Sequence, residues 1–377
     1  MISPKTRITV FLVWLVPFVM YSVAYTTFGS SIAILANVFR LSPIEVGALA
    51  SALSIGFIAT LPGGILSDRY GKRKIVSIGL AVCSVGLAAV GTSNSFVACF
   101  LSAVLLGIGA GVFEAAINPL ILDLYPEKRA FALGSAHLCW GVGGFFGPLL
   151  VGYAYSSYLD WRLAFYATSI FVVVAVLLFV IVRSPTAGST HSSENQPDFK
   201  LASLKPIWRL MLGNLLAWGI EACIVAWLII FFTTERGIGL FLATASLSIF
   251  FLLEAVGKPL WGLFADKYGY TLAARMCAVA GGILLFLATL NWPRLIPLLL
   301  MAPTGFFVGG IIPNITTAAC SRFQSASGAA SGIVNLGGDV GSIVLPFTFG
   351  IVVFLSNAFW GFALVSSLAI LLGLIAR

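Results

Sequence analysis

The sequence predicts an all-α membrane protein with twelve transmembrane helices, arranged as two six-helix bundles that repeat each other in parallel. Hydrophobic residues make up 60% of the 377 residues and charged residues 9%, whereas a soluble domain carries about 25% charged residues. The hydrophobic residues also form long blocks, close to the ~20 residues that cross a bilayer as a helix. A chain of this composition cannot cover a soluble surface, so a large soluble domain is excluded.

The expected spans are apolar runs that end at charged residues or at Pro and Gly. In the first half they cover residues 8–29, 43–63, 75–92, 96–122, 131–155 and 163–182, and in the second half 208–232, 241–262, 272–290, 295–319, 327–354 and 356–376. The polar segment between the two sets has the composition of a linker. We therefore expect an N-terminal bundle at 1–182, a cytoplasmic linker at 183–206 and a C-terminal bundle at 207–377.

The orientation follows from the basic residues. With the N-terminus inside, 17 of the 21 Lys and Arg residues lie on the inner side, which predicts cytoplasmic termini. These bases flank apolar blocks and form no stripe, so the net charge of +8 reflects topology and no nucleic acid is expected as a partner. The six cysteines lie singly inside apolar segments, without the spacing of metal ligands or disulfides. We expect no cofactor and no metal, and an ion gradient as the source of energy.

An internal repeat supports the two-bundle arrangement. A shift of 198 residues superimposes Gly64 on Gly262 and, without a gap, Gly152 on Gly350. Two parallel repeats of six helices form a known transporter architecture, in which the solute binds between the halves near the middle of the membrane. Two bundles in one chain make a monomer sufficient.

The loop between the second and third expected spans has residues suited to a latch, because its glycines allow a tight turn, its acid accepts hydrogen bonds and its bases donate them. This loop, at 64–74, resembles the signature loop of the major facilitator superfamily, and 262–269 resembles a weaker copy of it. In that family the loop latches the bundles together on the cytoplasmic side; the alternative is that the bases only fix the topology. The resemblance implies a gate made by Gly64, Asp68, Arg69, Gly71, Arg73 and Asp266.

Other segments resemble the fucose:proton symporter-like group of the same superfamily. The similar stretches are 107–118, 126–129, 137–141 and 218–221. The carboxylate that this group carries in span four maps onto Glu114. A glycine pattern in span five, which includes Gly143 and the pair Gly147-Pro148, resembles the superfamily's antiporter motif. Close helix packing explains this pattern equally well.

Four carboxylates lie inside the expected spans. Each costs roughly 2.5–3.5 kcal/mol at the bilayer centre, and such residues usually face a cavity and carry function. None has an acidic counterpart in the repeat. We expect Glu114, Glu221 and Asp339 to take part in proton coupling, with a buried structural hydrogen bond as the alternative. Glu254 precedes Lys258 by four residues near the cytoplasmic end, which predicts an ion pair or part of the gate.

Polar and aromatic residues share helix faces with these acids. The expected substrate-binding residues are Tyr21, Tyr25, Asn118, His137, Asn214, Trp218 and Asn335. No Lys or Arg is expected in the middle of a span, whereas sites for anions usually present a base. Amides with an aromatic ring suit a neutral, hydroxylated solute such as a sugar.

The sequence therefore predicts a secondary transporter that moves a small sugar-like solute by proton symport, with Glu114 as the main proton carrier. The alternative is a proton-coupled drug or metabolite exporter. A receptor without transport stays open, because a fold alone does not prove flux, and motifs of intramembrane enzymes are missing. The expected partners are the solute, protons or another coupling cation, and the lipid bilayer. The expected location is the cell membrane, with a prokaryotic inner membrane as the simplest setting.

Overall fold

The computed structural model describes residues 4–124, 129–181, 207–323 and 327–375. Every regular element within these ranges is a helix. The first half contains α1 (Pro4–Phe39), α2 (Pro43–Gly56), the short 3-10 helix η1 (Phe57–Ala59), α3 (Thr60–Tyr70), α4 (Lys72–Thr92), α5 (Phe96–Leu124), α6 (Arg129–Tyr158) and α7 (Arg162–Ile181). The second half contains α8 (Ile207–Ile230), the short π-helix η3 (Phe231–Glu235), α9 (Leu240–Tyr268), α10 (Tyr270–Thr289), α11 (Leu295–Val308), α12 (Ile311–Arg322), α13 (Ser327–Leu355) and α14 (Ala358–Ile375). The expected linker lies outside the described residues.

The number of helices that could span a membrane is close to the number of expected spans. Among the described residues, 11 helical segments are long and apolar enough to cross a membrane, and the last expected span is a shorter apolar helix, Ala358–Leu374. Some expected spans consist of two elements: α2, η1 and α3 follow one another directly, whereas Gly309 and Gly310 separate α11 from α12.

The largest error in the expected boundaries concerns the first span. It was expected to end at residue 29, but α1 runs on to Phe39. The added residues are mostly apolar and their hydroxyls bond within the helix: Ser31 donates to the carbonyl of Thr27 at 2.7 Å. The helix ends before Arg40, which adopts a positive φ of 52°, and Pro43 begins the next helix.

The chain forms two compact units by its internal contacts. Unit 1 comprises Met1–Ser42 and Leu49–Ala187, and unit 2 comprises Pro43–Ala48 and Gly188–Arg377. Many large apolar side chains on the helix surfaces are exposed, for example Leu177 and Ile181 on α7, as expected for helices whose outer faces contact lipid.

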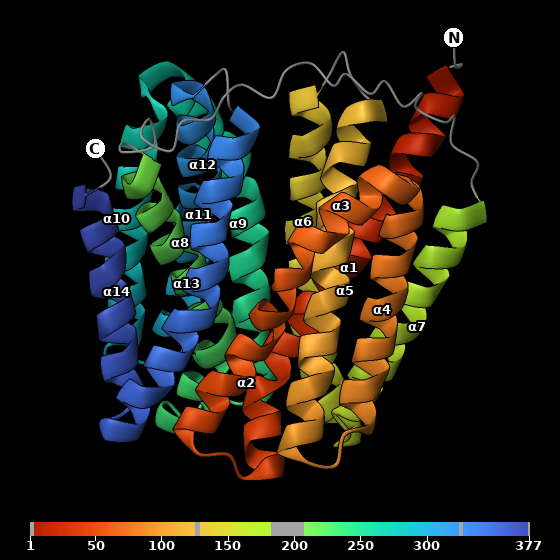
Figure 1. Cartoon of the computed structure of the whole chain (residues 1–377). Coiled ribbons are helices and arrows are strands. Elements are labelled where there is room, and N and C mark those ends of the chain that lie inside the picture. The colour runs from red at the N-terminus through yellow and green to blue at the C-terminus, as the bar shows by residue number, and fades with distance from the viewer. Residues whose placement is uncertain (1–3, 125–128, 182–206, 324–326, 376–377) are drawn as a thin grey trace. The chain divides into compact units, whose positions relative to one another are not determined.

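The same packing recurs in the two units, as the sequence repeat predicts. In unit 1, α1 packs on α6, and α4 packs on α5 and α7; in unit 2, α8 packs on α13, and α10 packs on α11 and α14 (Figure 1). Repeated glycines allow the close contacts. A Cβ atom on Gly107 would overlap the backbone of Leu53, and one on Gly305 would overlap the backbone of Phe250. The duplicated sequence thus builds two similar scaffolds, on which different side chains are placed.

Candidate functional site

Unit 1 contains an aromatic cluster around a carboxylate, here called the Tyr21–Glu114 cluster. It comprises Tyr21 and Tyr25 on α1, Phe113 and Glu114 on α5, and Trp140 on α6. The Tyr21 hydroxyl donates a hydrogen bond to Glu114 Oε2 at 3.4 Å. The Tyr21 ring lies 4.9 Å from the ring of Phe113 and 5.2 Å from that of Trp140. Tyr25 lies a further 5.2 Å from Trp140. Three helices therefore place aromatic rings and one acid together.

Close packing of α1 on α6 holds this cluster in place. Ser22 Oγ donates to the carbonyl of Trp140 at 2.5 Å. Gly143 lies against Ser22, and Gly147 lies against Thr26, so that a Cβ atom at either glycine would overlap α1. The span-five glycines thus have a packing role in this structure.

Two further residues were expected to join this site. Asn118 lies one turn after Glu114 on α5 and is half-buried; its Oδ1 atom is buried and has no hydrogen-bond partner among the described residues. The side chain of His137 lies outside the described part of the chain. Asn118 therefore offers an acceptor on the helix face that carries Glu114.

Unit 2 contains a charged group that we call the Glu221–Lys258 cluster, made by Glu221 on α8 with Glu254 and Lys258 on α9. Lys258 Nζ lies 2.5 Å from Glu254 Oε1. The side chain of Glu254 is 1% exposed and that of Lys258 17%. Glu221 interacts electrostatically with both. The structure therefore joins an expected coupling residue to two residues that were expected at the gate.

The position of Lys258 bears on the class of solute that the sequence led us to expect. Lys258 lies ten residues before Tyr268, the last residue of α9, which corresponds to about 15 Å along a helix. A base is thus present well inside a membrane-spanning helix of unit 2. The sequence expectation of a neutral solute rested on spans without a base in their middle, and Lys258 is a base that this argument has to take into account in unit 2.

The contact between α8 and α13 carries the remaining expected polar residues. Asn214 is fully buried, and its Nδ2 donates to the carbonyl of Val334 at 3.0 Å. Its Oδ1 and Trp218 Nε1 are buried without a hydrogen-bond partner among the described residues. Asn335 and Asp339 lie half-buried on α13. An unsatisfied buried donor and acceptor on one face of α8 would favour a polar ligand there.

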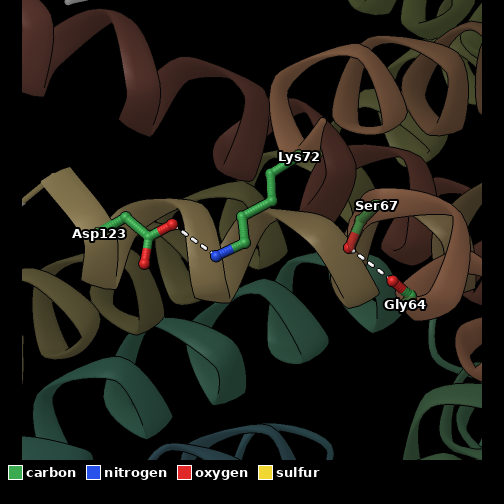
Figure 2. A network of polar contacts seen from close by, with 4 residues as sticks. All are labelled: Gly64, Ser67, Lys72 and Asp123. Carbon is green, nitrogen blue, oxygen red and sulfur yellow. Dashed lines mark hydrogen bonds and ion pairs between the residues drawn. The ribbon is translucent and has the colours of Figure 1, made fainter. Parts of the chain in front are cut away.

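The loop at 64–74 joins helices within unit 1. Gly71 has φ +93° and Gly269, its repeat partner, has φ +101°, so both loops make the tight turn that only glycine adopts easily. Lys72 Nζ forms an ion pair with Asp123 Oδ2 at 2.5 Å, and Ser67 donates to the carbonyl of Gly64 at 2.8 Å (Figure 2).

Two of the other expected gate residues make hydrogen bonds. Arg73 donates to the carbonyl of Phe179 at 2.6 Å, at the end of α7, and Asp266 accepts from Tyr270 at 2.7 Å. Asp68 and Arg69 are exposed. A Cβ atom on Gly64 would meet no other atom within 4 Å, so Gly64 makes no close helix contact among the described residues.

Sequence reasoning did not assign two residues to these sites. Trp140 was part of a resemblance, but its contact with both tyrosines depends on how α1 packs on α6. Asp123, near the end of α5, pairs with Lys72 from the start of α4. Its position shortly before Lys128 and Arg129 was a usable signal, because an exposed acid among bases can form an ion pair.

Comparison with known proteins gives three findings. Residues 13–346 match the family model described as Major Facilitator Superfamily. The chain is 28% identical to the cis,cis-muconate transport protein of Acinetobacter baylyi over 331 residues, which are 83% of this chain and 79% of that protein. It is 30% identical to the hexuronate transporter of Bacillus subtilis over 146 residues, only 34% of that protein.

Solved structures share the fold. The inward-open xylose transporter of E. coli has a TM-score of 0.80 and 16% identity, and the match covers 98% of this chain and 95% of that one. A bacterial homologue of the human lysosomal transporter Spinster, in an inward-facing conformation, also has a TM-score of 0.80 and 16% identity, with 100% and 97% covered. At these identities the likeness concerns the fold alone.

Proposed function

The chain belongs to the Major Facilitator Superfamily and is a multi-pass membrane transporter. We propose that it works by alternating access and carries a small hydroxylated, sugar-like solute by symport with protons. Such a transporter needs a polar binding surface for the solute and a group that binds and releases a proton. As a monomer in a prokaryotic inner membrane, the protein would draw its energy from the proton gradient.

The observation that carries this proposal is the Tyr21–Glu114 cluster. Aromatic rings pack against the apolar face of a sugar ring, and a carboxylate accepts hydrogen bonds from its hydroxyl groups. Tyr25, Glu114 and Trp140 are half-buried, so they are the members of the cluster that a solute can reach. Tyr21 is 3% exposed and packs behind them against the rings of Phe113 and Trp140. Glu114 is the acid of this cluster. An ionised Glu114 only accepts hydrogen bonds, whereas a protonated one can also donate one, so its protonation changes the hydrogen bonds open to Tyr21 and to a solute. We infer that Glu114 is the proton carrier of unit 1.

A second candidate function is proton-coupled transport of a small organic acid. Lys258 inside α9 supports it, because a buried base can bind a carboxylate. The relatives named for muconate and hexuronate transport support it too. A sugar acid carries hydroxyl groups as well as a carboxylate, so it belongs to the class of solutes that this second candidate predicts.

Proton flux in proteoliposomes tests these functions. Neutral sugars and polyols, sugar acids, dicarboxylates and organic cations are presented to the wild type and to Glu114→Gln and Lys258→Met, with pyranine as the pH indicator. Proton uptake with a neutral sugar, absent in Glu114→Gln, supports sugar symport. Flux only with acids, lost in Lys258→Met, supports the second candidate. Proton movement of opposite sign with organic cations contradicts both and indicates an exporter.

A further inference from the structure

The Glu221–Lys258 cluster contains two acids and one base. Lys258 pairs with Glu254 at 2.5 Å, and Glu221 on the neighbouring helix interacts with both. With all three groups ionised, two negative charges face one positive charge. The cluster then holds a surplus of one negative charge inside a membrane-spanning bundle.

The helices packed around α8 and α9 supply no base to compensate this charge. Arg275 on α10 donates to the carbonyl of Gly373 on α14 at 2.7 Å, and it is not among the groups that interact electrostatically with Glu221 or Lys258. Asp339 on α13 would add negative charge. The remaining charged residues on these helices lie at their ends, namely Arg209, Glu235, Asp266, Lys267 and Arg322. An uncompensated charge in such surroundings is unfavourable, so the cluster favours a state with one additional positive charge.

A proton suits this cluster better than a metal ion. Sodium and other hard cations require several oxygen ligands, but Glu254 already has the positive Lys258 Nζ against it. The described part of the chain contains no group of three or more His, Cys, Asp or Glu residues that could hold a metal ion. Gly309 also lies against the backbone and Cγ of Glu254, which leaves little room beside that acid. A proton needs neither space nor further ligands.

We propose that Glu221, Glu254 and Lys258 form one proton-binding site in unit 2, in which Lys258 stays paired with Glu254 and Glu221 binds the proton. Glu254 is fully buried and held by Lys258, whereas Glu221 is half-buried. Glu221 is thus the member of the cluster that can exchange a proton with water. Loading it makes the whole cluster neutral. This inference rests on the proposed proton coupling and adds a second proton site to that of Glu114.

The arrangement predicts how many protons each variant binds. Glu221→Gln leaves the neutral Glu254–Lys258 pair, so it binds one proton fewer than the wild type. Lys258→Met leaves two acids without a base, so it binds one proton more. The double variant Glu254→Gln/Lys258→Met removes one charge of each sign and keeps Glu221, so its proton count equals that of the wild type.

Potentiometric difference titration of the detergent-purified protein, from mildly alkaline to mildly acidic pH, counts these protons without a transport substrate. Size-exclusion profiles and melting temperatures establish that each variant is folded, and the double variant serves as the matched control for the two single ones. Glu114→Gln, titrated alone and together with Glu221→Gln, separates the two units. The losses are expected to add, because the two acids lie in different units.

The proposal is overturned if Glu221→Gln binds as many protons as the wild type, or if Lys258→Met binds no additional one. It is also overturned if sodium, compared with choline, lowers the proton count of the wild type and not that of Glu221→Gln. The flux assay separates this inference from the proposed function. Proton-coupled transport that persists with normal stoichiometry in Glu221→Gln contradicts only the role of unit 2.

Discussion

The two units share a scaffold and differ in the chemistry placed on it. The 198-residue repeat gives each member of the Tyr21–Glu114 cluster a counterpart in unit 2. Tyr21 corresponds to Gly219, Tyr25 to Cys223, Glu114 to Ile312 and Trp140 to Gly338. The three charged residues of unit 2 have Val23, Gly56 and Thr60 as counterparts. The residues of each cluster therefore correspond, by the repeat, to neutral residues in the other unit.

The glycines that both units share for close helix packing lie at repeat positions different from those of the polar clusters. Gly111 and Gly309 are repeat partners; Gly111 lies against the hydroxyl of Thr60, and Gly309 lies against Glu254. The glycine is kept for close helix contact in both cases, while the neighbouring side chain is a neutral hydroxyl in one unit and an acid in the other. Four predictions test this comparison of the two units.

The largest effect is expected from glycines that both units use. Gly107→Leu and Gly305→Leu should each prevent recovery of folded protein, because the added side chain overlaps backbone atoms that cannot move aside. Overpacking costs about 1–3 kcal/mol where neighbours can shift, and more where they cannot. Gly64→Ala and Gly262→Ala are the controls, since nothing lies within 4 Å of their Cβ positions. Folded yield is measured by size exclusion; a loss in only one unit would contradict a common scaffold.

The next effect concerns the acid that lacks a repeat partner. Glu114→Gln is expected to abolish uphill accumulation of the solute but to keep equilibrium exchange, because glutamine retains the hydrogen-bonding shape and cannot carry a proton. Ile312→Val, at the equivalent position of unit 2, should leave both activities unchanged. Uptake against a gradient and counterflow are compared in proteoliposomes. Accumulation equal to that of the wild type would remove Glu114 from the coupling mechanism.

A smaller effect is expected from the hydroxyl of Tyr21. Tyr21→Phe keeps the ring contacts and loses only the hydrogen bond to Glu114, which at 3.4 Å is long. A net loss of about 0.5–1 kcal/mol corresponds to a roughly two- to fivefold rise in apparent KM. Tyr21→Leu also removes ring contacts and should raise the KM further. If the two variants were equally impaired, the aromatic surface would not contribute to binding.

The smallest effect is expected at the ion pair between Lys72 and Asp123. The two side chains are 26% and 38% exposed, and water screens such pairs, so a double-mutant cycle should give a coupling of about 1 kcal/mol or less. Lys72→Ala, Asp123→Ala and the double variant are compared by thermal unfolding at low and high salt. The coupling should shrink as salt increases. A larger, salt-independent coupling would mean that this pair is buried in another conformation of the transporter.

Much of the fold could be predicted from the sequence, because a bilayer permits only helices of a certain length and the repeat dictates how they group. The errors arose where helices continue beyond a polar stretch. The end of the first span was placed too early because Ser30, Ser31 and Asn37 interrupt the apolar run, but their side chains bond to carbonyls one turn earlier in the same helix.

The residues of the candidate site were expectations from the sequence, and their grouping became visible only in the structure. Tyr21 and Glu114 were both expected from the sequence, since an acid in a membrane helix is costly and aromatic residues suit a solute. Glu221 and Lys258 were assigned to separate roles, because spacing along one helix cannot show which neighbouring helix lies opposite. Only the packing of α8 against α9 puts them in one cluster.

The sequence by itself determined the class of protein, the repeat and the identity of the buried charges, since composition, periodicity and an offset are properties of the chain alone. Tertiary structure decided which charges interact and which aromatic rings surround them. The physical reason is that electrostatic and ring contacts fall off over a few ångströms, and distances on that scale depend on how helices distant in the sequence pack together.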